Sequence, residues 1–136
     1  MGNGARMRAK MLMAEAASMH EDRTASIHRA GISEAIVPSV PILFKGSLYI
    51  RFEFEHEETR HHEIVITGQT DQGENLFPPH RYVHEAKADE TAHAYLLTIV
   101  VAFKALGQCS FAVAVNGEEL DRWPFNVRQE GLAPNV

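Results

Sequence analysis

The sequence predicts an all-β protein, and three observations support this fold class. Apolar and polar residues alternate through 48–54, a period of two that turns one side of an extended strand toward a core. Residues 98–101 are all β-branched, which favours a strand within a longer apolar run. Asn116-Gly117 follows another alternating segment, and this pair is preferred in two-residue hairpin turns because both positions require positive φ.

Length and composition are those of one ordinary globular domain. The chain has 136 residues, of which 45% are hydrophobic and 23% are charged. We expect a flexible N-terminal lead-in at 1–8, a single domain at 9–128 and a flexible C-terminal tail at 129–136. No apolar run approaches the roughly 18 residues of a membrane helix. A net charge of −5 argues against nucleic acid as a partner.

The first third of the chain carries conflicting signals. Ala, Met and Leu dominate residues 7–19, which favours a helix by propensity. Residues 24–28 are weakly strand-like, and the polar residues 21–23 would serve as a hairpin turn between two strands. A further segment, 32–37, ends before Pro38. These patterns alone leave helix and strand open for the opening segment.

The middle of the chain predicts several strands. Segments 48–54 and 64–67 each present one apolar face, and the polar stretch 56–60 between them predicts an antiparallel hairpin. A short strand is expected at 81–83. The nearly unbroken apolar run at 95–103 predicts a central strand.

The closing hairpin permits a prediction of register. With a turn at 116–117, Val113 should lie opposite Leu120. The next apolar set begins at Trp123 and is out of phase by one residue. We therefore expect a β-bulge near 121–122.

Three segments resemble a known family. LMAEAAS at 12–18, a short polar turn and SIHRAGI at 26–32 are similar to the start of a bacterial family of small uncharacterised proteins, the domain-of-unknown-function family numbered sixty-nine forty-one. Residues 106–127, with FAVAVNGEEL at 111–120, resemble the last hairpin of that family. The resemblance implies an immunoglobulin-like antiparallel β-sandwich of about seven to nine strands. It implies that the opening segment is a strand, and it carries no catalytic residues.

Eight histidines are the unusual feature of the composition. A zinc site needs three or four converging ligands. The candidates are His56, His61 and His62, which crowd one predicted turn, and His80 and His84, whose i, i+4 spacing suits a helical pair. His61 and His62 would point to opposite faces of a strand, so they cannot easily ligate one ion. The alternative is that these are solvated loop histidines with no metal.

Other patterns that carry chemistry are absent from the sequence. No G-x-S-x-G, G-x-G-x-x-G or Walker A motif occurs, so we expect no catalytic residues and no cofactor. Cys109 is the single cysteine, and we expect it to be a small buried side chain. Trp123 and Phe125 alternate in phase and are expected in the core.

These observations favour a non-enzymatic protein-interaction or ligand-binding module. A single cysteine is consistent with a cytoplasmic protein, and we expect neither a membrane nor a nucleic-acid partner. We expect a protein partner or a homodimer, with contact through the first strand or through the outer face of Ala112 and Ala114. The alternative is a small metal-dependent enzyme or metal-binding protein that uses the histidine-rich loops.

Overall fold

The computed structural model describes residues 7–22, 24–54, 61–87 and 89–131. These ranges contain nine strands and no helix that could cross a membrane. The strands are β1 (Met7–Met19), β2 (Ala25–Ala30), β3 (Glu34–Val37), β4 (Ile42–Phe54), β5 (His61–Thr70), β6 (His80–Glu85), β7 (Ala92–Phe103), β8 (Gly107–Val115) and β9 (Glu118–Gln129). The prediction of an all-β fold with about seven to nine strands is confirmed.

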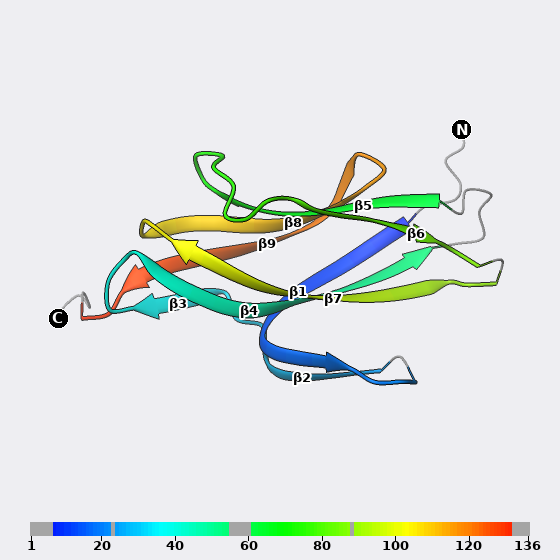
Figure 1. Cartoon of the computed structure of the whole chain (residues 1–136), viewed down its shortest axis with the longest axis horizontal. Helices are drawn as coiled ribbons and strands as arrows, with labels where there is room; N and C mark the ends of the chain where they lie inside the picture. The colour runs from blue at the N-terminus through cyan, green and yellow to red at the C-terminus, as the bar shows by residue number, and fades with distance from the viewer. Residues whose placement is uncertain (1–6, 23, 55–60, 88, 132–136) are drawn as a thin grey trace.

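The strands form two sheets (Figure 1). One sheet has four strands in the order β2-β1-β4-β7, and the other has five in the order β3-β9-β8-β5-β6. Paired strands are antiparallel except β3, which runs parallel to the end of β9. Strands β7 and β6 each form an edge of their sheet.

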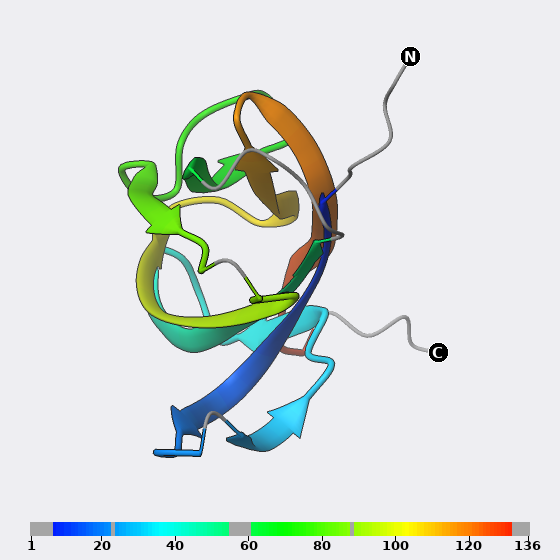
Figure 2. The ribbon, with the colours of Figure 1, turned by 90° about the vertical axis from the view of Figure 1, so that its right-hand side faces the viewer.

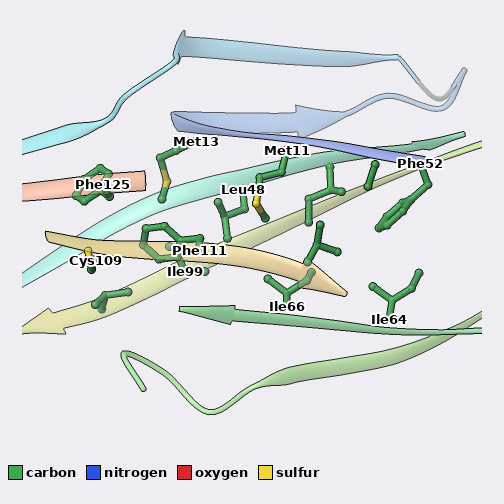
Figure 3. Close-up of a cluster of buried hydrophobic side chains, with 14 of the residues drawn as sticks. Met11, Met13, Leu48, Phe52, Ile64, Ile66, Ile99, Cys109, Phe111 and Phe125 are labelled. Carbon is green, nitrogen blue, oxygen red and sulfur yellow. The ribbon is translucent and has the colours of Figure 1, made fainter. Parts of the chain in front are cut away.

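The core lies between the sheets and takes alternate residues from each strand. In β4, Leu48, Ile50 and Phe52 are fully buried, whereas Arg51 and Glu53 are exposed. Each such side chain stabilises the fold by about 1.5–3 kcal/mol through burial. The other sheet contributes Ile64, Ile66, Phe111 and Phe125 to the same buried cluster (Figure 3).

Strand β1 forms although its composition favours a helix. Ala9, Met11 and Met13 alternate onto the core, and residues 7–14 pair with β4. Pairing and burial along this length outweigh propensity differences, which are below about 1 kcal/mol per residue. Beyond Ala14, β1 pairs with β2 alone, so the β1–β2 hairpin leaves the sandwich (Figure 2).

The β8–β9 hairpin confirms the predicted turn and moves the predicted bulge. Asn116-Gly117 has φ angles of 52° and 86°, as a type I′ turn requires. Val113 lies opposite Asp121, not Leu120, because the register shifts one residue earlier than expected. The Asp121 carboxylate then accepts a hydrogen bond from Met11 N–H at 2.8 Å, which ties β9 to β1 of the other sheet.

Two predictions about strand pairing are wrong. Strands β4 and β5 do not form a hairpin, because β4 pairs with β1 and β7, whereas β5 pairs with β6 and β8. The polar stretch 56–60 lies outside the described residues. Strand β7 is an edge strand, not a central one, and its outward Val100 is 57% exposed. A period of two identifies a buried face but not the neighbouring strand.

Candidate functional site

Aromatic and imidazole rings gather where the edge strands β6 and β7 face each other. His80, Tyr82 and His84 occupy alternate positions of β6 and are half-buried, while the residues between them are exposed. His93 and Tyr95 occupy alternate positions of β7 and are also half-buried. Because alternate residues of a strand share one face, these five rings meet in the seam between the two sheets.

The rings make continuous contacts along this seam. His84 and His93 stack with centroids 3.7 Å apart and planes 16° apart, and Tyr82 stacks on Tyr95 at 4.1 Å. Nε2 of His80 lies 2.6 Å from the Tyr95 hydroxyl oxygen, and the Tyr82 hydroxyl oxygen lies 3.4 Å from Nε2 of His93. Ring contacts therefore join two edge strands that belong to different sheets.

At one end of the seam, His84 and His93 meet Glu90 of the β6–β7 connection. The possible ligand atoms of these three residues all lie within 4.8 Å of one another, and no other such group occurs in the described part of the chain. Nε2 of His84 is 3.1 Å from Oε2 of Glu90. The His84 and Glu90 side chains are only 17% and 11% exposed, so solvent screens their interaction weakly.

The connection between β6 and β7 holds the Glu90 carboxylate in place. The Glu90 N–H donates to the Lys87 carbonyl at 3.1 Å, and Oε1 of Glu90 accepts from the Lys87 N–H at 3.0 Å. Oε2 is thereby left facing His84. The next residue, Thr91, accepts a hydrogen bond from Phe54 N–H at 3.0 Å, which anchors the connection to β4.

The surroundings keep the Glu90 carboxylate ionised and the two phenols neutral. Burial raises the pKa of Glu90, but the hydrogen bond from Lys87 and the charges of His84 and His93 outweigh it, so the pKa lies below its usual value. Burial, with a smaller effect of Tyr95, raises the pKa of Tyr82 far above its usual value. Burial also raises the pKa of Tyr95. The site thus presents one anionic oxygen donor beside two imidazoles.

This donor set matches a divalent transition metal in ligand type, and the side chains would reorient before they converge on one ion. Tetrahedral zinc, with bonds of about 2.0–2.2 Å, places its ligand atoms about 3.4 Å apart. Donors that now lie within 4.8 Å of one another would close by up to roughly 1.4 Å. The stacked rings of His84 and His93 would also tilt, because lone pairs of nearly parallel imidazoles do not converge on one point.

The cluster opens onto a cavity of about 480 Å³. Arg51 of β4 and Lys87 of the β6–β7 connection line it together with His84, Glu90 and His93. Met19, the last residue of β1, also lines the cavity, so the tip of the β1–β2 hairpin contributes to its wall. The site therefore combines metal-ligand donors, cationic side chains and space for a small molecule.

The structure separates the ligands that the sequence analysis selected. His61 and His62 face opposite ways at the start of β5, as predicted: His61 is exposed and His62 is buried. His80 and His84 lie on a strand, not a helix, so their spacing puts them about 13 Å apart along the chain. They cannot share one ion. His56 lies outside the described residues.

The prediction that the histidines lie in loops is wrong for most of those that the structure describes, although His28 and His61 are exposed to solvent. Strands contain His28, His61, His62, His80, His84 and His93.

Two members of the cluster, Glu90 and His93, were not among the sequence candidates. A signal for them was present: H-x-Y-x-H at 80–84 is followed by H-x-Y at 93–95, a shared period of two in consecutive strands.

Two other predictions about single residues are confirmed. Cys109 is 7% exposed, and burial, with a smaller effect of the Asp71 carboxylate, raises the pKa of its thiol to about 11. Such a thiol is a poor nucleophile at neutral pH. Phe125 is fully buried, and Trp123 packs against the core while its indole N–H donates to the Ile32 carbonyl at 2.8 Å.

Two sheets, a ring-lined seam and a half-buried His–Glu–His cluster define a small β-sandwich protein with a candidate ligand site. The model of a family of unknown function, DUF6941, matches residues 10–128, and the chain belongs to this family. The resemblance seen in the sequence is thereby confirmed. An immunoglobulin-like protein from Pseudomonas aeruginosa is similar at 13% identity and a TM-score of 0.42, over 93% of this chain and 100% of that chain. No curated protein matches.

Proposed function

We propose that this chain is a non-enzymatic binding module whose ligand is a divalent transition-metal ion held by His84, Glu90 and His93. The observation that supports the proposal is the convergence of these three donors, within 4.8 Å of one another, in a half-buried site. Two imidazoles and a carboxylate suit zinc and its neighbours among the transition metals, whereas magnesium and calcium prefer oxygen ligands alone. Zinc is the ion that we expect.

A metal-dependent enzyme is the second candidate, and one observation favours it. Three protein ligands leave a coordination position open, as in catalytic zinc sites. A hydrolytic enzyme also needs a base that can reach the bound water. Glu85 lines the cavity, but its Oε2 lies 2.6 Å from Nδ1 of His61, so that carboxylate already has a partner. We therefore prefer the binding module.

Calorimetric titration of chelator-treated protein with zinc tests the proposal. We expect one zinc ion per chain. We expect Glu90→Gln and His93→Asn each to weaken zinc binding by about 100-fold or more, which exceeds the roughly 10–100-fold loss typical when a residue that only hydrogen-bonds a metal ligand is replaced. His28→Asn is the matched control. His28 also pairs with a carboxylate, Glu15, at 3.2 Å, but that exposed pair has no third donor among the described residues.

The outcomes separate a metal site from a purely structural ion pair. Zinc at 100 times its dissociation constant should stabilise the wild type by about 2.7 kcal/mol and leave the Glu90→Gln protein almost unaffected. Zinc affinity that is the same in Glu90→Gln as in wild type would refute the assignment. A loss of affinity in His28→Asn as large as that in His93→Asn would refute it too.

A further inference from the structure

The cavity beside His84, Glu90 and His93 is also lined by two cationic side chains. Arg51 projects from β4 and Lys87 from the β6–β7 connection, and both line the cavity. Oε1 of Glu53 lies 3.3 Å from Nη2 of Arg8, and Oε2 of Glu53 lies 3.3 Å from Nε of Arg51. Two guanidinium groups thus share one carboxylate, so the positive charge of Arg51 is only partly offset.

A bound metal ion would change the charge balance of the cavity. Glu85 and Glu90 balance Arg51 and Lys87 in formal charge when the lining histidines are neutral. A divalent ion adds two positive charges to this otherwise balanced wall. Counted over the lining side chains alone, the metal-loaded cavity therefore has a net positive formal charge, although the whole chain carries a net charge of −5.

From this juxtaposition we infer that the metal-loaded protein binds a small organic dianion, with one carboxylate oxygen in the open coordination position and the second carboxylate facing Arg51. The inference rests on the proposed metal site. Three protein donors leave that position open to an outside ligand. Arg is suited to the far carboxylate because its planar fork can donate two parallel hydrogen bonds.

The rest of the wall suits a short carbon chain between the two charged ends. Met19, Ala92 and Ala94 line the cavity without offering any side-chain charge. The volume of about 480 Å³ lies in the range of about 300–1,000 Å³ that is usual for small-molecule sites. A dicarboxylate of a few carbons is thus the chemical class that fits both the polar and the apolar lining.

The test uses cobalt(II) as a coloured substitute for zinc and malonate as the probe dianion. Cobalt-loaded protein is titrated with malonate at constant ionic strength while its visible absorption is recorded. We expect a saturable spectral change, which Arg51→Met weakens by about tenfold or more while cobalt affinity stays unchanged. Lys45→Met is the matched control, because Lys45 is a cation on the same face of β4 but does not line the cavity.

Each outcome supports or refutes a separate part of the inference. A parallel titration with inorganic phosphate shows whether the site selects a dicarboxylate or accepts any oxyanion; saturation by phosphate alone would overturn the dicarboxylate assignment. Cobalt binding without a spectral response to malonate would refute the inference and leave the metal site standing. An equal loss in Arg51→Met and Lys45→Met would refute the role of Arg51. Failure of cobalt itself to bind would overturn both proposals.

Discussion

Gly68 of β5 is a position where one added methyl group tests the packing of the five-stranded sheet. A Cβ atom there would lie 2.7 Å from Cε2 of Phe77 and 3.0 Å from two ring atoms of Phe111. These two rings stack with centroids 6.2 Å apart, and Phe111 is fully buried, so it has little room to retreat. Overpacking of this kind costs about 1–3 kcal/mol.

The expected effect of Gly68→Ala is the difference between two opposing terms. Replacing a glycine inside a strand would by itself stabilise the fold by roughly 0.5–1 kcal/mol. The steric cost is larger over most of its range, so we expect the free energy of unfolding to fall by about 1 kcal/mol. Urea denaturation measures this change, and a lower midpoint with an unchanged slope would show that stability, not compactness, has altered.

A second substitution identifies the ring responsible for the effect of Gly68→Ala. Phe77→Ala removes the closest ring, so the double variant should lose about 1 kcal/mol less than the sum of the two single losses. Strict additivity, or a Gly68→Ala protein as stable as the wild type, would refute the idea that Phe77 closes over Gly68. It would also mean that the connection from β5 to β6 is packed differently.

Three further predictions follow from the same structure. Glu90 has a pKa below its usual value of 4.5, so its ionised form stabilises the fold above pH 4.5 and this contribution is lost as the pH falls. The difference in free energy of unfolding between wild type and Glu90→Gln, measured in urea, should therefore become smaller from pH 6.5 to pH 4. A constant difference would contradict this. Gly117→Val should lower the free energy of unfolding by about 1 kcal/mol or more, because φ at this position is 86°. Thermal unfolding measures this effect, and an unchanged melting temperature would contradict the positive φ of the turn. Ala112 is 7% exposed and lies opposite Arg122, so Ala112→Glu should lower the urea midpoint of the single chain. A variant that is monomeric by light scattering where the wild type is a dimer, and that is as stable as the wild type in urea, would contradict this.

The local patterns predicted most strands because burial and turn chemistry are local signals. Alternation over 48–54 corresponds to the buried face of β4, and Asn116-Gly117 forms the turn that its dihedral preferences predict. The opening segment is the exception. Its composition favours a helix, and only the family resemblance indicated the strand that pairing with β4 and burial of Met11 and Met13 produce.

The candidate site was only partly predictable, for a physical reason that its residues illustrate. His84 was selected from its spacing to His80, which was interpreted as a helical pair. The actual partners, Glu90 and His93, lie six and nine residues further along the chain. They meet His84 because β6 and β7 are edges of opposite sheets, and no local pattern states on which sheet a strand lies.

The sequence by itself determined the fold class, the faces of the strands and the closing turn, since each depends on residues close together in the chain. The tertiary structure decided which strands are neighbours, that β7 is an edge and that β4 and β5 belong to different sheets. It also decided the contacts of the candidate site: two imidazoles, the Glu90 carboxylate and Arg51 come to one cavity from β4, β6, β7 and a connection. Such convergence depends on long-range pairing, which alternation along a single strand does not encode.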